Sequence, residues 1–120
     1  MANQEHKGLR RIWNAFFFSL SGFKAVWQHE EAFRQELLLS VLMAPVAIWL
    51  GETIEDRLIL LSCLFLVLIV ELLNSAIEAV VDRVGLEHHE LSGRAKDIGS
   101  AAVFLSLTWT VIVWVSILIL

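Results

Sequence analysis

The sequence has few cysteines, prolines, glycines and charged residues. It therefore lacks the features of a disulfide-bonded secreted protein, of a protein with flexible linkers and of a nucleic-acid binder. Its one cysteine, Cys63, excludes an internal disulfide framework and a metal site built from several cysteines, and its apolar neighbours predict a small packing residue. One proline and six glycines among 120 residues leave no room for a flexible linker or a low-complexity segment. Charged residues make up only 18% of the chain and the net charge is −4, so nothing indicates a nucleic-acid binder.

The common sequence signatures of nucleotide binding are absent as well. The chain has no glycine-rich loop ending in GK[ST] and no HRD-type catalytic loop, which excludes the familiar soluble kinase designs. Its N-terminal residues lead into an amphipathic stretch, which differs from the apolar core of a cleavable signal peptide.

Apolar residues are what the sequence has in excess. They make up 58% of the chain, against about 45–50% in average soluble domains. A chain of this length forms one domain, 1–120, and a soluble domain of that size could not bury so much apolar surface. The composition therefore predicts an all-α membrane protein.

Three long apolar segments are expected to form helices that span the membrane, over about 31–50, 54–84 and 93–120. Pro45 is expected to kink the first of them, because proline cannot donate a backbone hydrogen bond.

The ends of these helices carry recognisable signals. Thr53, with Asp56 three residues later, resembles a capping box at the start of the second span. Gly85 can end that helix. Ser92 is expected to be the N-cap of the third span.

A different helix is expected before the first span, over about 6–27. Its apolar residues recur at helical spacing, and the basic residues Lys7, Arg10 and Arg11 lie on the opposite face. Such a helix lies flat in the membrane interface, either as an anchor only or also as a roof over a site at the cytoplasmic surface. Basic residues gather before the first span and between the second and third, so we expect a cytoplasmic N-terminus and a C-terminus across the membrane.

Polar side chains form a stripe on the second span. Glu71, Asn74, Ser75, Glu78 and Asp82 fall within about 100° of one helix face. From the rise per residue, Glu71 lies about 21 Å and Glu78 about 32 Å beyond the outer end of the span, so both approach the cytoplasmic surface. Ionisable groups in this setting are functional by default, although a polar contact that fixes helix packing is an alternative.

Two further polar clusters are expected at the same membrane surface. The first is HEEAFRQE, residues 29–36, in which Glu30 and Arg34 stand one turn apart and could form an ion pair. The second is EHHELSGRAKDIGS, residues 87–100, which suits a phosphate-and-magnesium site better than a transition-metal site, with a solvated loop as the alternative. Together these clusters could supply what phosphoryl transfer needs.

Three motifs resemble those of a known family. AFRQE at 32–36, VELLNSAIEAVVDR at 70–83 and HELSGRAKDIGSAA at 89–102 are similar to segments of the small bacterial integral-membrane diacylglycerol kinases, and the similarity covers essentially the whole chain. The resemblance implies a homotrimer in the bacterial inner membrane, with active sites between neighbouring subunits. It also implies that ATP, with Mg²⁺, phosphorylates diacylglycerol to phosphatidic acid, giving ADP, in lipid recycling.

By position, the resemblance also implies residue roles. Glu71 would be the general base, supported by Asn74, and Glu30 and Glu78 would hold the metal. The residues implied in ATP binding are Arg11, Ser19, Glu30, Glu78, Glu87, His88, His89, Lys96 and Asp97. Those implied in lipid binding are Arg11, Ala32, Phe33, Arg34, Gln35, Glu36, Trp49, Glu71 and Ser100. The sequence departs from the family pattern at Phe18, His29 and His88.

The residues alone leave other functions open. Undecaprenol is an alternative acceptor for the same chemistry. A non-enzymatic ion- or proton-conducting subunit could use Glu71, but it would need polar residues along a whole span, and here they gather at one surface. A regulatory or assembly protein could dock a partner through the N-terminal helix. That function would not explain why the second span carries the carboxylates of Glu71 and Glu78.

Overall fold

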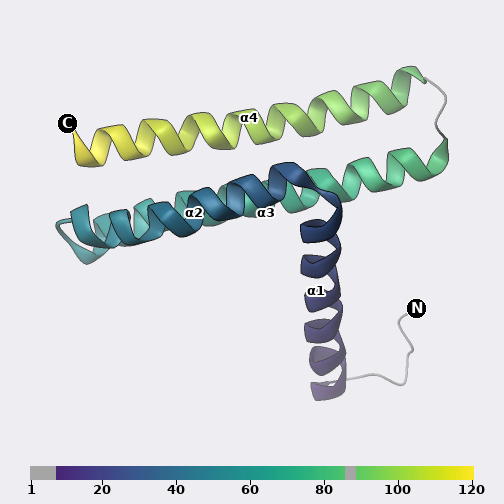
Figure 1. The fold of residues 1–120 in the computed structure, drawn as a ribbon, viewed down its shortest axis with the longest axis horizontal. Coiled ribbons are helices and arrows are strands. Elements are labelled where there is room, and N and C mark those ends of the chain that lie inside the picture. The colour runs from purple at the N-terminus through teal and green to yellow at the C-terminus, as the bar shows by residue number, and fades with distance from the viewer. Residues whose placement is uncertain (1–7, 86–88) are drawn as a thin grey trace.

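A computed structural model describes residues 8–85 and 89–120, which form four α-helices. They are α1 (Leu9–His29), α2 (Glu31–Leu50), α3 (Ile54–Val84) and α4 (Glu90–Leu118). The central helix α3 packs against both α2 and α4, and α1 leaves this bundle steeply at the start of α2 (Figure 1). The all-α class is confirmed, and α2, α3 and α4 are each long and apolar enough to cross a membrane.

The helix bounds follow the hydrophobic pattern closely. The structure places α2 and α3 over the expected residues, and α2 continues through Pro45 without a break. Membrane-spanning helices tolerate proline where neighbouring groups compensate for the missing backbone bond. In contrast, α1 runs two residues beyond the expected 27, and α4 begins three residues before the expected 93.

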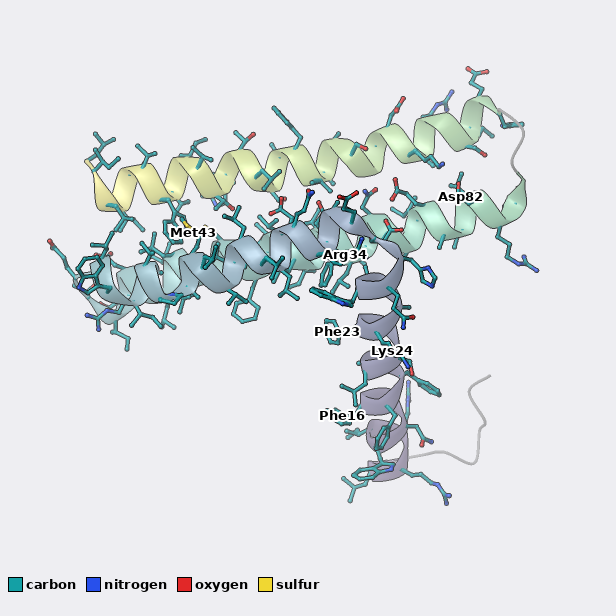
Figure 2. The ribbon with its side chains drawn as sticks, in the orientation of Figure 1. Phe16, Phe23, Lys24, Arg34, Met43 and Asp82 are labelled. Atoms are coloured by element: carbon teal, nitrogen blue, oxygen red, sulfur yellow. The ribbon has the colours of Figure 1, made fainter. Side chains whose placement is uncertain are left out.

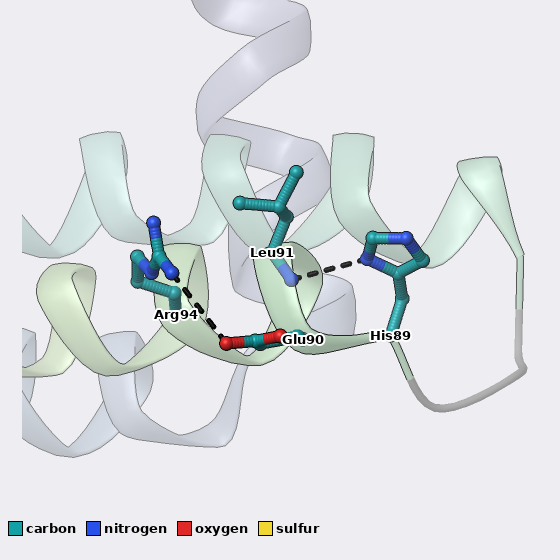
Figure 3. A network of polar contacts seen from close by, with 4 residues as sticks. All are labelled: His89, Glu90, Leu91 and Arg94. Carbon is teal, nitrogen blue, oxygen red and sulfur yellow. Dashed lines mark hydrogen bonds and ion pairs between the residues drawn. The ribbon is translucent and has the colours of Figure 1, made fainter.

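Two of the expected helix caps are present and one is wrong. The Thr53 side chain accepts a hydrogen bond from the Asp56 N–H at 3.1 Å, and Gly85 follows the last residue of α3. Ser92, however, lies within α4, and the N-cap is His89, whose Nδ1 accepts the Leu91 N–H at 3.1 Å (Figure 3). The histidine ring reaches the first free amides of the helix, so the helix starts earlier than a serine cap would allow.

The most buried residues lie between α2, α3 and α4, towards the end of the bundle that is far from α1. Ala47, Leu60, Cys63, Val113 and Trp114 form this core. The indole Nε1 of Trp114 donates to the Leu60 carbonyl at 3.2 Å. Cys63 is 3% exposed, which confirms its expected role as a small packing residue.

Closer to α1, α3 and α4 approach each other at a glycine. Gly99 is buried, and a Cβ added there would overlap the side-chain oxygen of Asn74. That oxygen is buried and accepts no conventional hydrogen bond from the described part of the chain. The Gly99 hydrogen that a Cβ would replace points at it, which is the arrangement of a weak Cα–H···O contact.

The helix α1 is held mainly at its C-terminal end. Val26 is its only buried residue, and the single residue Glu30 joins it to α2. Glu30 has extended backbone angles, φ −120° and ψ 105°, which turn the chain sharply between two helices. We call this turn the corner.

The buried indole bond of Trp114 can be tested with two matched substitutions. Trp114→Phe should lower the free energy of unfolding by about 1 kcal/mol, because the hydrogen bond to Leu60 is lost. Trp109→Phe removes the same atoms from a side chain of α4 that is 54% exposed, and it should have little effect. Thermal unfolding in detergent, followed by circular dichroism, gives the comparison. Equal shifts for both variants would contradict this account of the core.

The close approach at Gly99 gives a second prediction. Gly99→Ala should lower the free energy of unfolding by about 1–3 kcal/mol, because the added methyl group overpacks the contact with Asn74. Gly22→Ala is the control, since a Cβ there meets no atom within 4 Å and alanine is the better helix former. The same unfolding measurement distinguishes them, and a Gly99→Ala variant as stable as the control would be inconsistent with close packing.

Candidate active site

Carboxylate side chains gather where the corner meets α3. Ser75 Oγ donates to Glu30 Oε1 at 3.3 Å, and the Glu78 side chain lies beside the same carboxylate. Glu71, one turn earlier on α3, is only 5% exposed and lies within charge range of Glu30, Glu36 and Glu78. We call Glu30, Glu36, Glu71 and Glu78 the carboxylate cluster.

The spacing of these residues explains their convergence. Glu71, Ser75 and Glu78 are separated by four and three residues, so they share one face of α3. That face is turned towards the start of α2, which supplies Glu36, and towards the corner, which supplies Glu30. The structure therefore brings together the polar stripe of the second span and the HEEAFRQE cluster.

The cluster has no cationic partner in direct contact within residues 8–85 and 89–120. The ion pairs found there join Arg94 to Glu90 and Lys96 to Asp82, so none involves the cluster. Four like charges in a partly buried place repel one another and lose hydration. The arrangement therefore favours a bound cation.

The donor set fits Mg²⁺ held together with phosphate. Mg²⁺ is usually bound by one or two carboxylates, with waters and substrate phosphates completing its coordination. Glu30 and Glu78 provide two adjacent carboxylates. No group of three acidic, histidine or cysteine side chains in the described residues is arranged to hold a metal without such help. The ion would thus arrive with, or be completed by, a phosphorylated substrate.

A cavity of about 430 Å³ lies beside the cluster, between α1 and α3. Glu30 and Ser75 line one part of it, and Ser19 from α1 lines another. The hydroxyl of Ser19 donates to the Ala15 carbonyl at 2.9 Å within α1. Ser19 and the expected metal ligand Glu30 therefore line the same cavity.

An apolar groove of about 470 Å³ lies next to this cavity. Phe23 and Leu72 line both spaces, so the groove adjoins the cavity that Glu30 and Ser75 line. Phe33, one of the residues expected to bind lipid, lines the groove together with Phe65 of α3 and Lys24 of α1. A polar site beside an apolar groove suits an amphiphilic ligand.

Lys96 lies on the side of the cluster that faces α4. Its Nζ is 2.8 Å from Asp82 Oδ1, and the two side chains are 42% and 57% exposed. Lys96 also lies within charge range of Glu78. The pair therefore links α3 to α4 and holds an ammonium group close to the proposed metal ligands.

Arg34 does not form the ion pair with Glu30 that the sequence allows. Its Nη1 donates to the carbonyls of Trp27 at 2.6 Å and Gln28 at 3.3 Å. Carbonyls at the end of a helix lack partners within the helix and attract a cation, so the end of α1 competes successfully for this guanidinium. The Glu30 carboxylate is left to Ser75 and Glu78.

Several other expected site residues are exposed, cap a helix or lie outside the described part of the chain. Trp49 is 81% exposed and lies about 27 Å along α2 from its start. His89 caps α4. The residues Glu87 and His88 lie outside the described part of the chain. The remaining ones have exposed side chains, namely Arg11, Ala32, Gln35, Asp97 and Ser100.

Comparison with known proteins identifies the family. Residues 17–118 match the family model described as prokaryotic diacylglycerol kinase. The chain is 51% identical to a diacylglycerol kinase of Escherichia coli strain K12 over 119 residues, which cover 95% of this chain and 97% of that protein. It is 53% identical to one from Pseudomonas aeruginosa over 112 residues, covering 93% and 91%. It is 40% identical to one from Helicobacter pylori strain 26695 over 109 residues, covering 90% and 84%.

These matches extend over all four helices and over every residue of the carboxylate cluster. The chain is therefore a multi-pass membrane enzyme that belongs to the prokaryotic diacylglycerol kinase family.

Proposed function

We propose that this protein transfers the γ-phosphoryl group of ATP to the free hydroxyl of diacylglycerol at the cytoplasmic membrane surface, giving phosphatidic acid and ADP. The buried Glu71 carboxylate carries the proposal, because it lies within charge range of Glu30, Glu36 and Glu78. Glu30 also lines the cavity beside α1, and the apolar groove adjoins that cavity. The relatives named diacylglycerol kinase support the choice of acceptor.

In the proposed reaction, Glu71 acts on the lipid hydroxyl. Its carboxylate accepts the hydroxyl proton as the lipid oxygen attacks the γ-phosphorus. The new oxygen–phosphorus bond forms while the bond to the bridging oxygen of ADP breaks. Asn74, one turn along the same face of α3, would support the orientation of these groups.

Glu30 and Glu78 would hold Mg²⁺ on the phosphates of ATP. When bound, this ion neutralises charge that develops on the transferred phosphoryl group. The Lys96 ammonium would bind phosphate oxygens from the α4 side, after exchanging Asp82 for the ligand. The other residues proposed for the nucleotide are Arg11, Ser19, Glu87, His88, His89 and Asp97.

The lipid would lie with its hydroxyl near Glu71 and an acyl chain in the apolar groove that Phe33 lines. At the other end of α2, Trp49 would contact the chain far from the hydroxyl. The further residues proposed for lipid binding are Arg11, Ala32, Arg34, Gln35, Glu36 and Ser100.

The exposed apolar surface supports a membrane-embedded homotrimer. Phe65 on α3 and Phe104 on α4 are 65% and 71% exposed in the single chain. Lipid and neighbouring subunits would cover such side chains, and active sites between subunits would bring further groups to the half-open cavity. In this arrangement α1 lies along the cytoplasmic surface, because it crosses the direction of the bundle (Figure 1).

The role of Glu71 can be tested by substitution. Glu71→Gln should reduce kcat about 10²–10⁴-fold, because the amide cannot accept the hydroxyl proton. Glu31→Gln removes an exposed carboxylate near the same corner and should keep activity. The measurement is Mg²⁺-dependent phosphate transfer from ATP in mixed micelles. Full activity of folded Glu71→Gln would rule out the base role.

The same assay decides the acceptor. Diacylglycerol and undecaprenol should be offered side by side, with and without Mg²⁺. Formation of phosphatidic acid that requires Mg²⁺ is the expected result. Transfer to undecaprenol alone would keep the mechanism and change the substrate.

The nucleotide role of Lys96 gives a separate prediction. Lys96→Gln should raise the KM for ATP about tenfold or more, since one charge-assisted contact is lost, and should leave the KM for diacylglycerol unchanged. Arg94→Gln removes a positive charge two residues away whose partner is Glu90, and it should change neither constant. Steady-state kinetics with each substrate varied in turn tests this, and equal effects of both variants would argue against a specific contact.

A further inference from the structure

The guanidinium of Arg34 joins two helices across the corner. It belongs to α2, yet its Nη1 donates to the carbonyls of Trp27 and Gln28, which are the end of α1. The carbonyl of Val26, one residue earlier in α1, accepts the N–H of Glu30 at 2.9 Å. In Figure 2, Arg34 is labelled beside the point where α1 meets the bundle.

Few other contacts restrain the corner. Glu30 is the only residue between the helices, so its two backbone dihedrals set both the direction of α1 and the direction of its own side chain. Val26 is the one buried residue of α1. The hydrogen bond from Ser75 to Glu30 is long, at 3.3 Å, and cannot by itself fix the carboxylate.

We propose that Arg34 is a positioning residue, which fixes the corner so that the Glu30 carboxylate stays beside Glu78 and Ser75. This inference rests on the metal role proposed for Glu30. Its physical basis is that the two carbonyls held by Arg34 lie two and three residues before Glu30. Fixing them fixes the backbone that enters the corner, and a metal ligand needs such support to hold its geometry.

The shape of the side chain matters to this role. Both carbonyls accept from one nitrogen, Nη1, which the planar guanidinium holds in a fixed direction, whereas a lysine ammonium is a point charge on a flexible stem. Arg34→Lys should therefore restore only part of the function. Arg34→Gln removes the positive charge and shortens the side chain, so that it no longer extends as far towards the carbonyls of Trp27 and Gln28.

The first test is kinetic and uses the full-length protein in mixed micelles. Arg34→Gln should raise the concentration of Mg²⁺ required for half-maximal activity about tenfold, because partners that orient a metal ligand have effects of this size. Arg34→Lys should lie between this variant and the natural protein. This effect on Mg²⁺ should appear whether or not the KM for diacylglycerol also rises, since Arg34 is also among the residues proposed to bind the lipid. Arg10→Gln, which removes an arginine from the exposed surface of α1, is the matched control and should behave as the natural protein.

The second test measures the site without turnover. Mn²⁺ replaces Mg²⁺ together with a non-hydrolysable ATP analogue, and free Mn²⁺ is followed by electron paramagnetic resonance. Arg34→Gln should weaken Mn²⁺ binding by the same factor, and Arg10→Gln should not. Amide hydrogen exchange across residues 26–31 should be faster in Arg34→Gln only, since the end of α1 is no longer tied to α2.

The opposite outcomes are distinct. A higher KM for diacylglycerol with unchanged Mn²⁺ affinity would overturn the proposal and leave Arg34 as a lipid contact. A lower thermal stability with unchanged Mn²⁺ affinity would reduce Arg34 to a purely structural role. If the natural protein phosphorylated no lipid, the proposed function would fail, whereas hydrogen exchange would still report whether Arg34 holds the corner.

Discussion

The geometry of the site depends on one extended residue, Glu30, which turns the chain from α1 into α2. Because only the two backbone dihedrals of Glu30 connect the helices, the position of the Glu30 carboxylate depends on the directions of both helices. The same carboxylate accepts a hydrogen bond from Ser75 on α3. The position of this one side chain therefore depends on three helices, so the corner is both a structural joint and a part of the candidate active site.

The carboxylate cluster lowers the stability of the single chain, and the proposed function gives a reason for it. Glu71 is almost fully buried, and its charged neighbours are other carboxylates. Packing alone would be served better by apolar side chains of similar size, because unpaired buried charges are costly. Placing the cluster at the end of the bundle where α1 departs lowers this cost, since a cation, water and phosphate can reach it there. The stable core around Leu60 and Trp114 lies towards the other end.

Much of the fold could be predicted from periodicity. The apolar runs predict α2 and α3, and the helical spacing of Glu71, Ser75 and Glu78 predicts that these residues share one face. These features are local along the chain, and local patterns are what a sequence displays directly.

Contacts across the corner and between helices could not be predicted in the same way. The spacing of Arg34 and Glu30 allows an ion pair one turn apart, but Arg34 bonds the end of a different helix, which only the fold brings near. His89 caps α4 in place of Ser92, because two acceptors competed within three residues. Gly99 has no side chain, so its close approach to Asn74 leaves no pattern in the sequence.

The openness of the site follows from the shape of the chain. Helix α1, the corner and α3 form only part of a wall around the cavity, and α4 reaches the cluster mainly through Lys96. Long apolar side chains on α3 and α4 face outwards in the single chain. The exposed apolar surface and the half-open cavity lie on the same thin molecule, so the neighbouring copy that we propose would cover the first and close the second.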